Sequence, residues 1–139
     1  MTQPLPTRPL VMIVDDDADS LDINAALLNA TGFDTCQTST AMHAIEMAVT
    51  RRPAAILTDV SMPFVDGWTI LRTLQEHPIT ARTPIVLMTG YGDDATRQRA
   101  AAAGCHAFLT KPCPPDLMLE TLKAAVAVDA ERRQTVQDV

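Results

Sequence analysis

Residues 10–17 of the chain are Leu-Val-Met-Ile-Val-Asp-Asp-Asp, an apolar run that ends abruptly in three acids. Five consecutive apolar residues predict a strand that is covered on both faces, because a half-exposed strand would alternate apolar and polar residues. Residues 54–58, 85–88 and 107–109 form similar short runs, and residues 33–38 form a weaker one. We therefore predict five strands, each covered by other parts of the chain.

Segments with apolar residues at helical spacing separate these runs. The core-facing positions of the first, second, third and last predicted helices are Leu21, Ala25 and Leu28; Ala41, Ile45 and Ala48; Ile70, Leu71 and Leu74; and Leu119, Leu122 and Val126. Ser39 or Thr40 is the expected cap of the second helix, and Asp93 and Asp94 suit the start of the fourth. The alternation of strands and helices predicts an α/β fold with a doubly wound parallel sheet.

The length and composition indicate one compact domain. The chain has 139 residues, of which 47% are hydrophobic, and we assign residues 9–128 to the domain. Residues 1–8 are expected to form a flexible tail, and residues 129–139 a helix extension or a linker. The three cysteines lack the spacing of a zinc or redox motif, which fits a reducing compartment.

The net charge of −6 would repel the phosphate backbone, so no direct nucleic-acid partner is expected. No apolar run approaches the roughly 20 residues of a membrane-spanning helix. We therefore expect no membrane partner and a cytoplasmic location.

Polar residues stand at or just after the ends of four predicted strands: Asp15 and Asp16, Asp59, Thr89, and Lys111. Because the carboxyl ends of parallel strands share one edge of the sheet, these four segments are expected to form one pocket. Three crowded carboxylates repel one another unless a cation offsets their charge. An all-oxygen cluster suits Mg²⁺ better than a metal that prefers histidine or thiolate ligands.

This set of residues suits phosphoryl transfer. A carboxylate can act as a nucleophile toward phosphorus if the charge of the transferring group is neutralised, and Asp59 is placed for that role. Lys111 can pair with the phosphoryl oxygens, and the Thr89 hydroxyl can donate a hydrogen bond to another. Asp17 and Asp19 are interpreted as residues that complement a helix dipole or face solvent.

The chain resembles the receiver domain of two-component response regulators over residues 9–128. The resemblance rests on Val-Asp-Asp-Asp at 14–17, Asp-Val-Ser-Met-Pro-Phe-Val-Asp-Gly at 59–67, Met-Thr-Gly at 88–90 and Lys-Pro at 111–112. It implies that Asp59 is the phosphoacceptor and that Asp15, Asp16 and the Ser61 backbone carbonyl help to hold Mg²⁺. It also implies that Thr89 and Lys111 contact the phosphoryl group.

The same resemblance implies a flavodoxin-like sheet in the order 2-1-3-4-5 and a cis bond between Lys111 and Pro112. Phe108 matches the aromatic switch residue that moves with Thr89, although tyrosine is common at that position. Ser61 and Tyr91 match positions that tune the lifetime of the aspartyl phosphate. Because neither is an acid or an amide, slow self-hydrolysis is expected.

The implied partners are proteins. A histidine kinase or a histidine phosphotransfer protein would supply the phosphoryl group, and a downstream protein would bind the changed surface around the fourth helix, fifth strand and fifth helix. The receiver would be a monomer or a phosphorylation-dependent dimer. It would not be an enzyme acting on a separate substrate.

Three alternatives were weighed against this interpretation. A receiver-like docking module that signals without phosphorylation would normally lose some of these site residues, yet all are present. A haloacid dehalogenase-like phosphatase would use Asp15 as nucleophile and would leave Asp59 without a role. A calcium loop starting at Asp15 is excluded, because Ser20 and Ala26 stand where a glycine and a bidentate glutamate are required.

Overall fold

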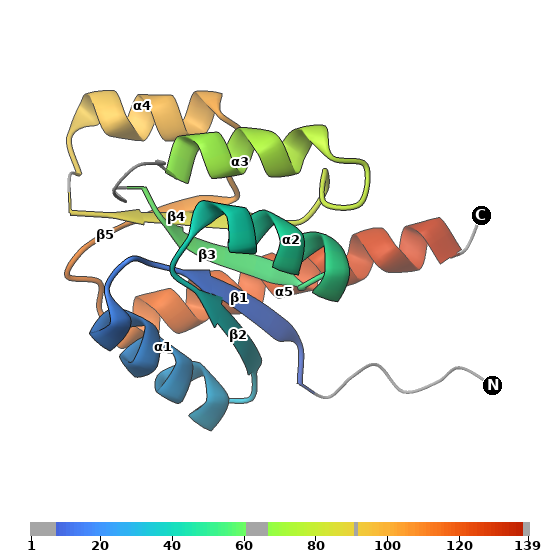
Figure 1. Ribbon diagram of the computed structural model, residues 1–139, viewed down its shortest axis with the longest axis horizontal. Helices are drawn as coiled ribbons and strands as arrows, with labels where there is room; N and C mark the ends of the chain where they lie inside the picture. The colour runs from blue at the N-terminus through green and yellow to red at the C-terminus, as the bar shows by residue number, and fades with distance from the viewer. Residues whose placement is uncertain (1–7, 61–66, 91, 138–139) are drawn as a thin grey trace.

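The computed structural model describes residues 8–60, 67–90 and 92–137, and within these ranges the chain forms one parallel sheet. The strand order is β2-β1-β3-β4-β5, with every neighbouring pair parallel (Figure 1). The strands are β1 Leu10–Val14, β2 Asp34–Thr38, β3 Ala55–Asp59, β4 Ile85–Thr89 and β5 Ala107–Thr110. The flavodoxin-like order predicted from the resemblance is therefore confirmed.

Helices cover both faces of the sheet (Figure 1). They are α1 Ala18–Ala30, α2 Ala41–Arg51, α3 Gly67–Glu76, α4 Asp94–Ala102 and α5 Pro115–Gln137. Buried residues of α1 and α5 pack with one set of strand side chains, whereas those of α2, α3 and α4 pack with the other set. The fold is thus a three-layer sandwich with the sheet in the middle.

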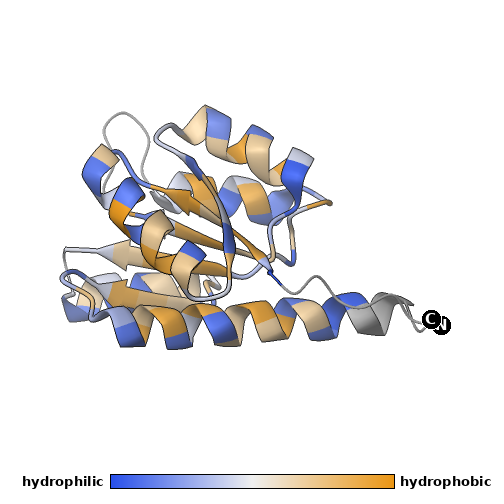
Figure 2. Ribbon diagram, turned by 90° about the horizontal axis from the view of Figure 1, so that it is seen from below, coloured by the Kyte–Doolittle hydropathy of each residue, from blue (hydrophilic) through white to orange (hydrophobic). Residues whose placement is uncertain are grey.

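The first strand shows why its sequence carries no polar residue before Asp15. Val11 and Ile13 point into the core beneath α1 and α5, whereas Met12 and Val14 point into the core beneath α2, α3 and α4. Burial of such a side chain contributes about 1.5–3 kcal/mol, so a polar replacement on either side would be costly. Figure 2 shows mostly hydrophobic strands and helices that alternate between hydrophobic and hydrophilic residues.

Capping side chains set the starts of two helices. The Thr40 hydroxyl accepts a hydrogen bond from the His43 backbone N–H at 3.3 Å, which identifies Thr40 rather than Ser39 as the cap of α2. The Asp93 carboxylate accepts the Thr96 N–H at 2.8 Å at the start of α4. Hydrogen bonds from Thr96 also lower the pKa of Asp93, because they stabilise its charged form.

Several strand boundaries differ from the prediction by one residue, and two of these differences involve Asp59 and Phe33. The sequence predicts Asp59 directly after its strand, but Asp59 is the last residue of β3, since it pairs with Met88 of β4. At the start of β2, Phe33 does not join the strand. Its N–H donates to the Leu28 carbonyl at 3.1 Å and closes α1, with Gly32 at a φ of 105°.

The last helix continues beyond the domain boundary placed at residue 128. α5 runs to Gln137 and carries a buried acid, Asp129, whose carboxylate lies 2.8 Å from Arg133 Nε. Burial raises the pKa of Asp129, and the charge of Arg133 opposes this rise. The side chains of Arg132 and Arg133 donate to the carbonyls of Arg82 and Arg52. These contacts hold α5 against the loops at the amino ends of the strands.

The segment before β1 and the peptide bond after Lys111 also have defined structures. Arg8, the last residue of the predicted tail, lies 2.9 Å from Asp34 Oδ1 through its Nε. The Lys111–Pro112 bond is cis, as the resemblance implies. Among the described residues, no helix has both the length and the apolar character to cross a membrane.

The start of α3 leaves no room for a side chain. A Cβ on Gly67 would lie 2.5 Å from the Asp59 carbonyl oxygen and 2.8 Å from the Val60 Cα. We predict that Gly67→Ala lowers the free energy of unfolding by about 1–3 kcal/mol, because the backbone at the end of β3 must move. Urea denaturation would measure the change.

Gly90→Ala is the matched control, since a Cβ on Gly90 would meet nothing within 4 Å. Equal stability of the two variants would contradict the prediction.

Candidate functional site

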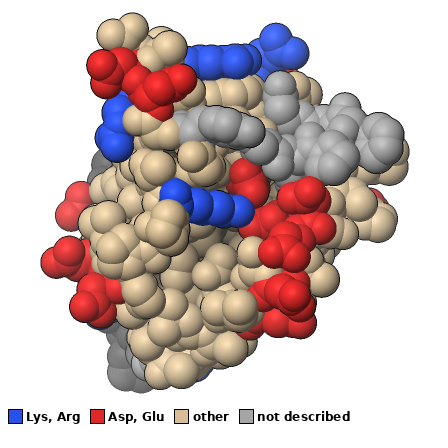
Figure 3. All heavy atoms as spheres, turned by 90° about the vertical axis from the view of Figure 1, so that its left-hand side faces the viewer, with Lys and Arg blue, Asp and Glu red and all other residues tan. Residues whose placement is uncertain are grey.

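The carboxyl ends of the strands meet at one edge of the molecule. Figure 3 looks onto this edge, where a basic side chain lies beside a group of acidic ones. Asp15 and Asp16 directly follow β1, and Asp59 ends the neighbouring strand β3. The structure therefore brings together acids that lie more than forty residues apart in the chain.

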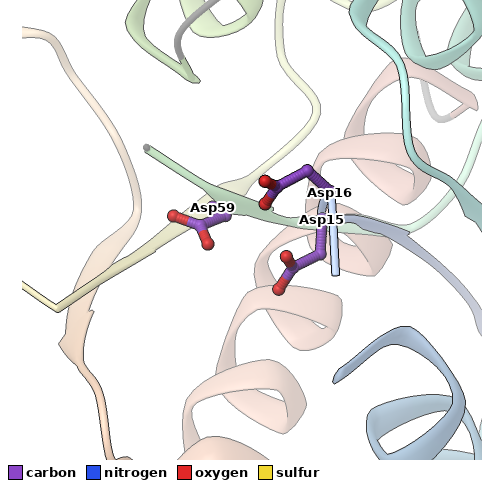
Figure 4. Close-up of side chains that lie close together, drawn as sticks. All are labelled: Asp15, Asp16 and Asp59. Carbon is purple, nitrogen blue, oxygen red and sulfur yellow. The ribbon is translucent and has the colours of Figure 1, made fainter. Parts of the chain in front are cut away.

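The three acids form a compact cluster of oxygen atoms. One carboxylate oxygen from each of Asp15, Asp16 and Asp59 lies within 4.8 Å of the others. Asp15 is 4% exposed and Asp59 is 7% exposed, whereas Asp16 is open to solvent. In Figure 4 the Asp15 and Asp16 carboxylates turn toward the side on which Asp59 lies. The cluster thus combines two sheltered carboxylates with an open one.

Lys111 supplies the positive charge beside this cluster. Its Nζ lies 2.7 Å from Asp59 Oδ2 and 3.2 Å from Asp15 Oδ2. Burial lowers the pKa of Lys111, but the hydrogen bonds and charges of Asp59 and Asp15 outweigh this effect and raise it overall. The ammonium group is therefore charged at neutral pH and bridges the two sheltered acids.

The second oxygen of Asp15 is held by the backbone. Asp15 Oδ1 accepts the Asp17 N–H at 3.0 Å. Asp17 is the residue before α1, and its carboxylate accepts the Ser20 hydroxyl at 2.7 Å, which lowers the pKa of Asp17. Asp17 therefore serves the start of α1, in agreement with its interpretation as a helix-dipole residue.

Thr89 lies at the end of β4, between the strands that carry Asp59 and Lys111. It is 1% exposed and pairs in register with Thr110 of β5. The Lys111 N–H donates to the Thr89 carbonyl at 2.7 Å. One backbone hydrogen bond thus joins the end of β4 to the residue that follows β5.

Phe108 of β5 lies opposite Leu87 of β4 and is partly buried against the core beneath α2, α3 and α4. The Arg97 guanidinium of α4 lies 5.6 Å from the centre of the Phe108 ring. Sequence reasoning did not select Arg97, because no motif distinguishes it from other arginines of a polar helix. The predicted roles of Ser61 and Tyr91 concern residues that lie outside the described ranges.

The donor set fits a hard divalent cation. It consists of carboxylate oxygens, and Mg²⁺ and Ca²⁺ prefer such oxygen ligands to nitrogen or sulfur. A dication would also offset the repulsion among three carboxylates that one ammonium group balances only in part. Asp15, Asp16 and Asp59 could therefore hold a metal ion.

Comparison with known proteins assigns most of the chain to one family of domains. The sequence profile of the response regulator receiver domain matches residues 11–123. The polar-differentiation response regulator DivK of Brucella anthropi is 28% identical over 114 residues, which are 82% of this chain and 93% of DivK.

Solved structures give the same result. The chemotaxis response regulator CheY4 of Vibrio cholerae has a TM-score of 0.79 at 25% identity, with 86% of this chain and 99% of that chain covered. The signal receiver domain of a signal transduction histidine kinase from Syntrophus aciditrophicus has a TM-score of 0.78 at 27% identity, covering 86% of this chain and 90% of that chain.

The bridge made by Lys111 leads to a prediction about stability. Lys111→Met should lower the free energy of unfolding of the metal-free protein by about 1–3 kcal/mol, because it leaves Asp15 and Asp59 sheltered without their shared cation. Urea unfolding in the presence of a chelator would measure this loss. Lys123→Met, on the exposed side of α5, is the matched control.

The loss of unfolding free energy in Lys111→Met should also depend on pH. Because the folded pKa of Lys111 is raised above its ordinary value of 10.5, its contribution is fully present below 10.5 and disappears as the pH rises through the folded pKa. A difference between the wild type and Lys111→Met that persists at still higher pH would show that the charge is not its cause.

Proposed function

The chain belongs to the family of response regulator receiver domains, and we propose that it is a phosphorylation switch whose phosphoacceptor is Asp59. The observation that carries this proposal is the position of the Asp59 carboxylate. It lies within 4.8 Å of two other acids and 2.7 Å from the Lys111 ammonium group. A nucleophilic carboxylate between a metal-binding pair and a fixed cation has what phosphoryl transfer requires.

Asp15, Asp16 and Asp59 would hold Mg²⁺, together with the backbone carbonyl of Ser61. When bound, the ion supplies positive charge that neutralises the phosphoryl oxygens. The carboxylates of Asp15 and Asp16 orient that charge toward Asp59. Asp15 is suited to this task because its other oxygen is already fixed by the Asp17 N–H.

The phosphoryl donor is a histidine kinase or a histidine phosphotransfer protein. An Asp59 carboxylate oxygen forms a bond to phosphorus while the bond between phosphorus and the donor's histidine nitrogen breaks. The electron pair of that bond stays on the imidazole nitrogen, and a proton already on the other ring nitrogen makes the leaving imidazole neutral. The products are an aspartyl phosphate and a neutral histidine, so no oxidant or further reactant is needed.

Lys111 and Thr89 then bind the new phosphoryl group. The Lys111 ammonium, now paired with Asp59 and Asp15, forms an ion pair with a phosphoryl oxygen. The Thr89 hydroxyl donates a hydrogen bond to another oxygen. Rotation of Thr89 allows Phe108 to move inward, which changes the surface around α4, β5 and α5.

The output is the binding of a downstream protein to this surface. The chain itself acts as a monomer or as a phosphorylation-dependent dimer. The domain catalyses only its own phosphorylation and a slow dephosphorylation. It is therefore a signalling phosphoacceptor and not an enzyme with a separate substrate.

Asp59→Asn should abolish phosphorylation by a small acyl phosphate in the presence of Mg²⁺, because an amide cannot replace the nucleophilic carboxylate. Mass spectrometry of the intact protein and of its peptides would detect and locate the modification. Asp17→Asn is the matched control, since Asp17 neighbours the cluster but serves α1. Label on Asp15 in either protein would instead support a phosphatase-like nucleophile.

Thr89→Ala should still accept a phosphoryl group on Asp59 but should respond to it less. The variant keeps the nucleophile and loses the hydroxyl that couples the phosphoryl group to Phe108. Amide NMR spectra before and after phosphorylation would measure the response of β5 and α4. Thr89→Ser retains a hydroxyl and should respond as the wild type does, and equal responses from the alanine and serine variants would refute this role.

A further inference from the structure

Helix α4 is attached to the domain by few apolar contacts. Ala100 is its only buried residue. Two arginine side chains that precede this alanine, Arg97 and Arg99, lie over aromatic rings of other elements. The Arg97 guanidinium lies over Phe108 of β5, and the Arg99 guanidinium lies 4.4 Å from the centre of the Trp68 ring of α3. The two arginines therefore reach in different directions from the same helix.

Arg97 makes two hydrogen bonds besides its contact with Phe108. Its Nε donates to the Gly92 carbonyl at 3.3 Å, and its Nη2 donates to the Thr110 hydroxyl at 3.5 Å. Gly92 precedes α4, whereas Thr110 is the last residue of β5. One guanidinium group thus joins the segment that follows β4 to the end of β5.

Both joined segments lead directly to proposed site residues. Gly92 is three residues after Thr89, and Thr110 immediately precedes Lys111. The segments already touch, because a Cβ on Gly92 would lie 2.7 Å from Thr110 Cγ2. In addition, the Lys111 N–H donates to the Thr89 carbonyl. A shift of Arg97 would therefore change how Thr89 and Lys111 face Asp59.

We propose that Arg97 is a positioning residue for phosphorylation of Asp59, because it fixes the separation of the two segments that carry Thr89 and Lys111. This inference rests on the proposed function of the site. The planar fork of an arginine suits the task, since it donates along two directions while its face stacks on Phe108. The side chain of Arg97 contacts Gly92, Thr110 and Phe108, so its effect on Asp59 would be indirect.

Loss of the Arg97 contacts is expected to lower the rate of Asp59 phosphorylation and not the affinity for Mg²⁺. Misplacement of catalytic groups by about 1 Å can cost up to about a hundredfold in rate, and we expect a smaller loss of about tenfold for a partial shift. The Mg²⁺ affinity should stay unchanged, because Asp15, Asp16 and Asp59 keep their positions. This difference separates positioning from a general loss of structure.

The test compares Arg97→Gln, Arg97→Lys and Arg99→Gln in the full chain. The rate of Asp59 phosphorylation is followed by mass spectrometry at a fixed concentration of acetyl phosphate and saturating Mg²⁺, and the Mg²⁺ dissociation constant is measured by calorimetry. Arg97→Gln should react about tenfold more slowly. Arg97→Lys should recover part of the loss, since it keeps the charge and one donor group.

Arg99→Gln is the matched control, because it removes the same charge from the same helix but loses a contact with Trp68 of α3 in place of the hydrogen bonds to Gly92 and Thr110. It should react at the wild-type rate. The proposal is overturned if Arg97→Gln reacts within twofold of the wild type, if Arg99→Gln is slowed equally, or if the Mg²⁺ affinity of Arg97→Gln falls in proportion to its rate. An unmodified wild-type Asp59 would instead remove the proposed function, and this inference with it.

Discussion

The attraction between one ammonium group and two sheltered carboxylates organises the functional edge of this domain. Asp59 and Asp15 repel each other at short distance, and Lys111 offsets that repulsion from 2.7 Å and 3.2 Å. In the sheet order, β5 is separated from β3 by β4, so the Lys111 side chain spans the end of β4. Thr89, which ends β4, consequently lies at the end of the strand that separates β3 from β5.

The backbone at Asp59 is held more firmly than helix α4 is. The backbone after Asp59 is fixed from two directions, because the Val60 N–H donates to Met88 of β4 and the Gly67 N–H of α3 donates to the Val60 carbonyl. By contrast, α4 buries only Ala100 and depends on arginine contacts to its neighbours. Elements with few buried apolar contacts are the ones that open or shift at low free-energy cost. A rigid acceptor beside a loosely attached helix is a suitable construction for a switch.

The two acids that follow β1 illustrate how much a local sequence pattern can predict. The run of apolar residues before Asp15 indicates a strand that is covered on both faces, and the alternation of such runs with helical segments predicts a layered α/β fold. It does not show which acid is sheltered. Only the packing of β1 beside β3 shelters Asp15 and leaves Asp16 in solvent. A similar limit applies to Asp59, which the sequence predicts after the strand but which the pairing with Met88 includes within it.

The sequence by itself determined the fold class, the approximate strands and helices, and the short set of polar residues at the strand ends. These properties can be predicted from the sequence because burial leaves continuous apolar runs in strands that are covered on both faces and apolar residues at helical spacing in the helices. The tertiary structure alone decided that Lys111 pairs with both Asp59 and Asp15, that Thr40 and not Ser39 caps α2, and that Arg97 joins Gly92 to Thr110. Such choices depend on distances between side chains from separate elements, and a periodic pattern along the chain carries no information about those distances.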